Sequence, residues 1–202
     1  MRKLVVNTFL SLDGIMQAPG GPEEDPTGGF ELGGWSVTYW DEVMAGKMTE
    51  LMGDDFDLLL GRRTYEIFAA YWPNSEESGA DELNSAKKFV ASRTLTDPTW
   101  ENSTVIGDDV EAEVRALKEA EGPEIQVHGS ANLLQTLLAS DVVDELRLLI
   151  FPVILGKGKR LFGDRALPAG LELVDSATSS TGVSINTYRR AGEVPIGSFA
   201  MD

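Results

Sequence analysis

Hydrophobic residues recur along the chain with two different spacings, which change from one segment to the next. Short apolar runs bounded by glycine or polar residues are typical of buried strands, and a spacing near 3.6 residues is typical of amphipathic helices. Helices are expected to begin near Ser36, Arg62, Asp108 and Asn132. Strands are expected at residues 3–10, 56–60, 88–91, 104–106, 124–128, 143–155, 171–175 and 183–189.

The order of these elements alternates strand and helix and then ends in strands alone. Alternation of this kind is typical of parallel strands joined by helical crossovers. We therefore predict an α/β fold with a mostly parallel twisted sheet, helices on both faces and an antiparallel C-terminal edge. At this length one domain over residues 1–202 is expected. Residues 17–34 are rich in glycine, proline and acidic side chains, and we interpret them as a long loop able to act as a lid.

Charge and composition narrow the classes of function. The formal net charge is −16, which argues against a nucleic-acid partner because phosphate backbones are bound by concentrated basic faces. No apolar run approaches the roughly 20 residues of a membrane span. The chain has no cysteine and one histidine, so thiolate chemistry and a cysteine or histidine metal site are excluded. A cytoplasmic protein without a bound metal is the expectation.

Three segments that follow predicted strands combine arginine, hydroxyl and glycine residues. They are Gly61-Arg62-Arg63-Thr64, Ser92-Arg93 and Gly129-Ser130-Ala131-Asn132. The carboxyl ends of parallel strands form the usual ligand edge of an α/β sheet, and helix N-termini favour anions. The pattern is that of a dinucleotide site without the G-x-G-x-x-G fingerprint, and an additional ribose phosphate would explain Arg93. The alternative for the arginine pair is a solvated surface.

Candidates for the chemistry itself lie near the same strand ends. His128 is a candidate proton donor or ligand-orienting group, with a hydrogen-bonded histidine packed in the sheet as the alternative. Asp13 is a candidate catalytic or substrate-contacting residue, or else a turn-forming aspartate. Trp40 and Phe9 are candidate substrate contacts, since aromatic side chains stack on planar heterocycles. Packing in the core is the alternative for the tryptophan.

The motifs in order resemble the dihydrofolate reductase-like fold family, and within it the reductase domain of bacterial riboflavin biosynthesis (the RibD C-terminal domain) and its stand-alone relatives. The segments that carry this resemblance are residues 10–14, 59–66, 90–93, 125–133, 143–146 and 152–158. The resemblance implies NADPH as cofactor. It also implies a homodimer, which we expect through residues 143–152.

The same resemblance implies cofactor contacts along the chain. Gly61, Arg62, Arg63 and Thr64 match positions that hold the cofactor phosphates, and Ser92 and Arg93 match positions near the ribose phosphate. The segment beside the cofactor is matched by Gly129, Ser130, Ala131, Asn132 and Leu133. The loop that closes over the nicotinamide is matched by Asp13, Gly14 and Ile15.

The expected function is NADPH-dependent reduction of a small, heterocyclic or sugar-linked substrate. The nearest activity by resemblance is that of 5-amino-6-(5-phosphoribosylamino)uracil reductase. Folate reduction is not expected, because the middle of the first helix, near Ala45, lacks the carboxylate that dihydrofolate reductases place there. The alternative is a non-catalytic protein that binds a nucleotide or another small ligand on the same fold.

Overall fold

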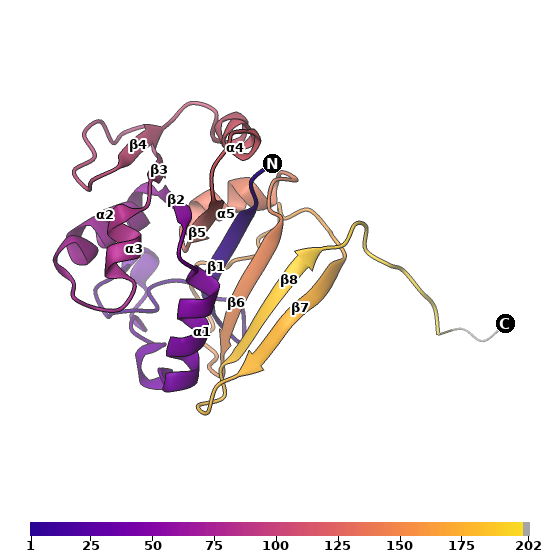
Figure 1. Ribbon diagram of the computed structural model, residues 1–202. Helices are drawn as coiled ribbons and strands as arrows, with labels where there is room; N and C mark the ends of the chain where they lie inside the picture. Colours follow the sequence, from indigo (N-terminus) through magenta and orange to yellow (C-terminus); the bar gives the residue numbers. More distant parts are fainter. Residues whose placement is uncertain (200–202) are drawn as a thin grey trace.

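The architecture is an eight-stranded sheet, which the computed structural model describes over residues 1–199 (Figure 1). The strand order is β4-β3-β2-β5-β1-β6-β8-β7. β1 to β6 are parallel, whereas β8 and β7 pair antiparallel, which confirms the predicted fold class. The predicted domain ends at residue 202, outside the described residues. The strands are β1 Leu4–Ser11, β2 Phe56–Gly61, β3 Lys88–Ala91, β4 Ser103–Ile106, β5 Glu124–His128, β6 Glu145–Phe151, β7 Leu171–Thr178 and β8 Ser184–Arg190.

Helices cover both faces of the sheet, as expected (Figure 1). Successive side chains of β2 point to opposite faces of the sheet. Leu59 packs with α4 and α5 on one face, whereas Leu58 and Leu60 pack with α2 and α3 on the other. α1 covers the latter face further along the sheet. Within residues 1–199 no helix has the length and apolar character of a membrane span. The helices are α1 Glu42–Met52, α2 Arg62–Tyr71, α3 Ala80–Ser85, α4 Val110–Glu119 and α5 Ala131–Leu138.

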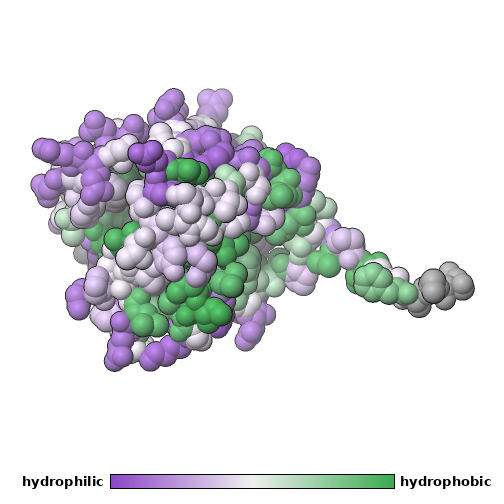
Figure 2. All heavy atoms as spheres, turned by 90° about the horizontal axis from the view of Figure 1, so that it is seen from below, coloured by the Kyte–Doolittle hydropathy of each residue, from purple (hydrophilic) through white to green (hydrophobic). Residues whose placement is uncertain are grey.

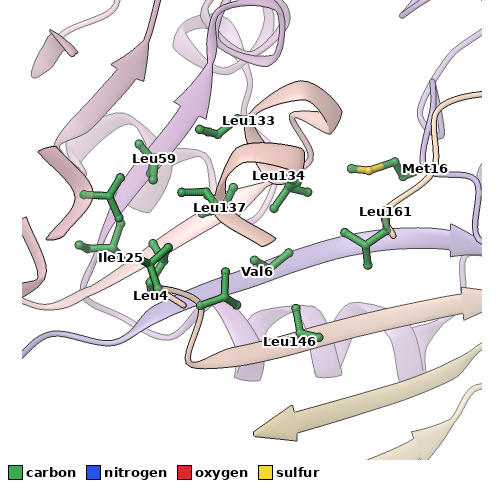
Figure 3. Packing of buried hydrophobic residues seen from close by; sticks show 14 of the residues in the cluster. Leu4, Val6, Met16, Leu59, Ile125, Leu133, Leu134, Leu137, Leu146 and Leu161 are labelled. Carbon is green, nitrogen blue, oxygen red and sulfur yellow. The ribbon is translucent and has the colours of Figure 1, made fainter. Parts of the chain in front are cut away.

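The largest hydrophobic cluster lies between the central strands and α5. Figure 3 shows Leu4, Val6 and Ile125 from the strands facing Leu134 and Leu137 from α5. All five side chains are fully buried, and burial of each such side chain stabilises the fold by about 1.5–3 kcal/mol. This packing fixes α5 on the sheet and therefore fixes where its N-terminus lies relative to the strand ends.

The start of the first helix differs from the prediction. α1 begins after Asp41, whose carboxylate accepts a hydrogen bond of 2.8 Å from the amide of Met44. Ser36 instead donates its hydroxyl to the carbonyl of Pro19 and precedes a short 3-10 helix. Serine and aspartate are both good N-caps. The choice between them depends on the contact with Pro19, which is remote in sequence.

Two further boundaries differ from the prediction. Between α2 and β3, where the sequence pattern predicted no helix, lies α3, a six-residue helix whose Ala80 and Leu83 are buried. A helix this short has too few apolar positions to show a periodic pattern. The long predicted strand at 143–155 ends at Phe151, because Pro152 has no amide hydrogen to continue the ladder.

The long loop at 17–34 is fastened to the body of the protein. The buried Gln17 donates its side-chain amide to the carbonyl of Asp25 at 2.9 Å. The carboxylate of Asp25 forms ion pairs with Arg63 at 3.1 Å and with Lys159 at 2.6 Å. The role of the loop as a lid stays a prediction, and these contacts are the ones that an opening movement would break.

Candidate functional site

The segments predicted to bind a ligand lie side by side at one edge of the sheet. β3, β2, β5 and β1 are consecutive in the strand order and parallel, so their carboxyl ends share that edge. Adjacent strands are about 4.8 Å apart, so this row of four strand ends is about 14 Å long. The structure thus brings Ser92-Arg93, Gly61–Thr64 and Gly129–Asn132 together along a line that suits an extended ligand.

The starts of α2 and α5 contact each other through Ser130. The amide of Gly61 donates to the hydroxyl oxygen of Ser130 at 2.8 Å, and the hydroxyl of Ser130 donates to that of Thr64 at 2.9 Å. A Cβ atom on Gly61 would lie 3.2 Å from the Ser130 hydroxyl oxygen, so a larger residue there would crowd the junction. The sequence pattern found both helix starts but not this contact.

Backbone conformation at the start of α5 is unusual for a serine. Gly129 and Ser130 have φ angles of 60° and 70°, and the peptide bond between them is trans. Non-glycine residues in this region are uncommon and tend to cluster at functional sites. Neither α2 nor α5 has a side-chain cap at its N-terminus. Their first-turn amides therefore remain suited to an anion.

Arg62 and Arg63 lie at this edge, and both are engaged with other residues of the protein. Arg62 donates to the carboxylate of Glu66 at 2.6 Å and also to the hydroxyl of Thr94. Arg63 forms the ion pair with Asp25 in the long loop. Both guanidiniums are about half exposed. The Arg62–Glu66 pair is exposed on both sides and contributes at most about 1 kcal/mol, so exchange of Glu66 for phosphate would cost little. The partner of Arg63 is different, because Asp25 is largely buried and also pairs with Lys159.

Arg93 differs from these two arginines because it is exposed and forms no ion pair or hydrogen bond with residues 1–199. Ser92 shapes the turn around it. The hydroxyl oxygen of Ser92 accepts hydrogen bonds from the amides of Thr94 at 3.2 Å and Leu95 at 3.0 Å. The turn thus presents a free guanidinium beyond the end of β3, next to the start of α2.

Asp13 holds a turn together. Its carboxylate accepts hydrogen bonds from the hydroxyl of Ser11 at 2.7 Å and from the amides of Leu155 at 3.1 Å and Gly156 at 2.9 Å. The Ser11 hydrogen bond, aided by the two amides, lowers the pKa of Asp13 to about 2. The group is therefore ionised at neutral pH and has no proton to donate. Gly14 follows with a φ of 81°, which suits glycine.

Two predicted cofactor residues have buried side chains instead. Ile15 is fully buried, and its amide and carbonyl both bond to Ser11, so its side chain packs in the core while its contact with a cofactor stays a prediction. Leu133 is also buried and packs in the α5 cluster. Ala131 is partly buried against that cluster, and Asn132 is exposed at the start of α5. Sequence matching alone could not separate residues that support the site from residues that line it.

A row of polar side chains crosses the sheet beneath the end of α1, and the sequence analysis identified only His128 from it. Glu124, Gln126 and His128 alternate along β5, so all three lie on one face. Asn7 and Arg147 lie beside them on β1 and β6. A polar residue at every second position of a strand was a signal that could have revealed this row.

Hydrogen bonding fixes the orientation of the fully buried Gln126. Its side-chain nitrogen donates to the carbonyl of Met52 at 2.8 Å and to the carboxylate of Glu124 at 2.7 Å. Both partners are acceptors only, so the amide oxygen must face the other way. There it lies 3.1 Å from the Asn7 side-chain nitrogen and 2.9 Å from His128 Nε2. His128 therefore carries its proton on Nε2, and Asn7 turns its oxygen away from Gln126.

His128 is neutral at physiological pH. Burial, followed by the positive charge of Arg147, lowers the pKa of His128 from 6.5 to about 4. Between these two values the unfolded chain binds a proton that the folded chain does not. Stability from this residue is therefore complete above pH 6.5 and is lost as the pH falls toward 4. A neutral imidazole accepts or donates hydrogen bonds but cannot act as a strong acid at pH 7.

Aromatic side chains border the polar row. Phe9, which follows Asn7 on the same face of β1, lies 6.4 Å from the ring of Trp40 and 5.3 Å from that of Phe151. Phe68 of α2 lies 6.4 Å from the imidazole of His128. Trp40 is 50% exposed. Phe9 therefore lies two residues beyond Asn7, the strand partner of His128, and Trp40 contacts Phe9. Apolar surface beside a few oriented polar groups is typical of small-molecule sites.

Comparisons with known proteins identify relatives of this chain. The family model of the RibD C-terminal domain matches residues 2–185. The uncharacterized protein YyaP of Bacillus subtilis (strain 168) is 30% identical over 201 residues, covering 95% of this chain and 96% of that protein.

Solved structures share the fold at low identity. A candidate riboflavin biosynthesis protein from Shewanella sp. PV-4 has a TM-score of 0.67 at 21% identity, with 94% of this chain and 99% of that chain covered. A pyrimidine reductase-like protein from Corynebacterium diphtheriae NCTC has a TM-score of 0.65 at 16% identity, with 95% and 93% covered. Dihydrofolate reductase from Enterococcus faecalis, complexed with NADP(H), has a TM-score of 0.59 at 16% identity, with 93% and 96% covered.

Proposed function

The chain belongs to the RibD C-terminal domain family, and on that premise we propose that it is an NADPH-dependent reductase of a small, heterocyclic or sugar-linked substrate. The names of two structural neighbours, a pyrimidine reductase-like protein and a candidate riboflavin biosynthesis protein, support this class of reaction. A role in riboflavin biosynthesis, in the cytoplasm, is the corresponding cellular proposal. Its basis is the resemblance to 5-amino-6-(5-phosphoribosylamino)uracil reductase.

The observation that carries the proposal is the free guanidinium of Arg93 at one end of a row of anion-binding groups. The residues present fit a phosphorylated dinucleotide. The uncapped starts of α2 and α5, with Arg62 and Thr64, would hold the central phosphates, and Arg93 would hold the phosphate on the ribose. When bound, NADPH supplies the hydride, and the protein positions the acceptor and excludes water.

The chain's own residues provide positioning rather than acid catalysis. Phe9 and Trp40 offer apolar surface to a planar substrate, and Gln126 holds the imidazole of His128 in one tautomer. His128, with a pKa of about 4, and Asp13, with a pKa of about 2, are both deprotonated at pH 7. This observation favours a second candidate function, a non-catalytic protein that binds the nucleotide or another small ligand.

Replacing Arg93 by alanine is expected to weaken NADPH binding by about 10- to 100-fold, because a charge-assisted hydrogen bond contributes about 1.5–3 kcal/mol. NADH, which lacks the ribose phosphate, should bind wild type and variant alike. Quenching of the intrinsic fluorescence of the four tryptophans would report both titrations. Arg165→Ala is the matched control, because Arg165 is likewise exposed and forms no ion pair or hydrogen bond with residues 1–199.

Three outcomes separate the candidates. Equal losses for NADPH and NADH in Arg93→Ala would contradict the placement of the ribose phosphate. Absence of binding of either nucleotide by the wild type would contradict the reductase and the nucleotide-binding form of the second candidate. Tight NADPH binding without loss of absorbance on any carbonyl or pyrimidine acceptor would favour the non-catalytic protein over the reductase.

A homodimer is also proposed, although not through the segment that the sequence suggested. β6 lies between β1 and β8, so residues 145–151 have no free edge for a second copy. β7 is the last strand in the order and exposes Leu171, Leu173 and Val174. The segment after β8 projects from the body nearby and carries hydrophobic surface (Figures 1 and 2). Sedimentation equilibrium giving the 21.9 kDa mass of one chain would contradict the dimer.

A further inference from the structure

Asn7 has a buried acceptor that no other described residue satisfies. The side chain is 7% exposed, and its oxygen has no hydrogen-bond partner among residues 1–199. Buried polar groups in native proteins are nearly always paired, so each exception needs an explanation. The orphaned oxygen lies in the row of polar residues bordered by Phe9, in the middle of β1 and opposite the last residue of β5.

Exchanging the oxygen and nitrogen of the Asn7 side chain by rotation would not give the oxygen a hydrogen-bond donor. The Asn7 nitrogen faces the oxygen of Gln126, and Gln126 cannot turn over because its own nitrogen is held by Met52 and Glu124. A rotated Asn7 would therefore place oxygen against oxygen. The surrounding residues therefore fix the Asn7 oxygen as a free acceptor, and a donor for it must come from outside residues 1–199.

His128 offers a second acceptor at the neighbouring position. Because Nε2 carries the proton toward Gln126, Nδ1 has a free lone pair, and no hydrogen bond to Nδ1 is formed by residues 1–199. Asn7 and His128 are register partners on the adjacent parallel strands β1 and β5, whose backbones are about 4.8 Å apart. The same Gln126 side chain orients both residues.

Two acceptors carried by register partners on adjacent strands suit one amino group. A planar amino group that donates two hydrogen bonds of about 2.9 Å, diverging by about 120°, reaches acceptors about 5 Å apart. A ligand carbonyl or unprotonated ring nitrogen in that place would face the two protein acceptors without offering a donor. A ligand ammonium group would find no available carboxylate nearby, because Glu124 and Glu145 already form ion pairs with Arg147.

We propose that Asn7 and His128 together bind the amino group of a neutral, planar nitrogen heterocycle, with Gln126 as the positioning residue that fixes both acceptors. This proposal adds to the proposed reductase function the chemical group through which the substrate is recognised. It rests on the reductase function only in calling the bound molecule a substrate. Asn7 is thereby a specificity-determining residue. Binding of the ring starts from the solvent side at partly exposed His128 and requires displacement of the side chains that bury the Asn7 oxygen.

The test compares 2-aminopyrimidine with 2-methylpyrimidine, which has nearly the same size but no N–H group. Both are titrated without NADPH at pH 7.5, and the ring signals of His128, the single histidine, report binding by NMR. The amino compound should bind with a Kd of about 1 mM and at least about tenfold tighter than the methyl compound. Asn7→Leu should remove most of this difference.

Stability measurements separate recognition from a structural role. Asn7→Leu removes an unsatisfied acceptor together with one hydrogen bond to Gln126, whose oxygen keeps His128 as a donor, so its urea midpoint should lie close to that of the wild type. Asn186→Leu is the matched control. Asn186 is also buried but has both side-chain atoms satisfied by Ser176 and Ser184, so this variant should lose stability and keep the probe preference.

Equal affinity for the two probes, or no binding of 2-aminopyrimidine up to about 10 mM, would overturn the proposal. A larger stability loss in Asn7→Leu than in Asn186→Leu would overturn it as well, because that result assigns Asn7 a structural role. NADPH titration of the same samples tests the reductase function separately, since Asn7→Leu should leave nucleotide binding within about twofold of the wild type.

Discussion

Replacing Arg147 with leucine is expected to destabilise the protein by about 3–5 kcal/mol, because the change leaves the carboxylate of Glu124 without a cation and leaves Glu145 with only its contact to Lys3 at 3.3 Å. The guanidinium donates to both oxygens of Glu124, at 2.8 and 3.1 Å, and to Glu145 at 2.9 Å. It also donates to the carbonyl of Leu51 at 2.6 Å. Its side chain is 12% exposed. Chemical denaturation at pH 7.5 would measure the loss.

The Leu51 contact makes this arginine important for the position of α1. The last carbonyls of a helix have no partner within it, and cations near that end are favourable. Arg147 and Gln126 satisfy carbonyls at the end of α1 from the sheet below. The variant should therefore also loosen the helix that borders the proposed substrate region, with faster amide hydrogen exchange in residues 42–52 as the observable.

Arg189→Leu is the control, because it removes an arginine from the same sheet whose ion pair with Glu172 is exposed on both sides. Its effect on the free energy of unfolding should be small. The single histidine supplies an independent signal. Loss of the positive charge of Arg147 should raise the pKa of His128 from about 4 in an NMR titration. An unchanged midpoint, or a stability loss no larger than that of Arg189→Leu, would contradict this account.

Replacing Phe151 with alanine is expected to cost about 3–5 kcal/mol, because the variant removes a large aromatic side chain from a closely packed cluster. Phe151 is fully buried. Its ring centroid lies 5.3 Å from Phe9, 5.3 Å from Trp35 and 5.9 Å from Tyr39. Thermal and urea unfolding would both report the loss.

Phe162→Ala is the matched control for this variant. The side chain of Phe162 is 49% exposed, so its removal should change the stability much less. Because Phe151 supports Phe9 from behind, Phe151→Ala should also weaken binding of 2-aminopyrimidine, whereas Phe162→Ala should not. Equal stability losses in the two variants would show that the aromatic cluster does not support β6 and β1 in this way.

The fold and the location of the candidate phosphate-binding edge could be predicted because their signals are local. The strand-glycine-arginine pattern at residues 56–63 predicts β2 and the start of α2, and the structure has both. Parallel strands then bring Ser92-Arg93 and Gly129-Ser130 to the same edge by topology alone. Residue types that favour phosphate therefore identified the candidate cofactor edge before any contact was known.

The identity of the lining residues was decided by contacts between segments far apart in sequence. Asp13 matched a functional loop, yet its carboxylate is used by Ser11 and by amides more than a hundred residues away. Ile15 and Leu133 matched cofactor positions and are buried. A one-dimensional pattern records residue type, whereas the availability of a side chain depends on what the folded chain places against it.

The sequence by itself determined the sheet, its mostly parallel order and the row of cationic and small residues along one edge. These follow from hydrophobic periodicity and turn chemistry, which act over a few residues. Only the tertiary structure decided which nitrogen of His128 carries the proton and which atom of the Asn7 side chain lacks a partner. The proton position on one and the orphaned oxygen of the other depend on Gln126, which is itself held by Met52 and Glu124. Which atom donates and which accepts is fixed by contacts that include residues far apart in sequence. The spacing of residues along the chain does not reveal these contacts.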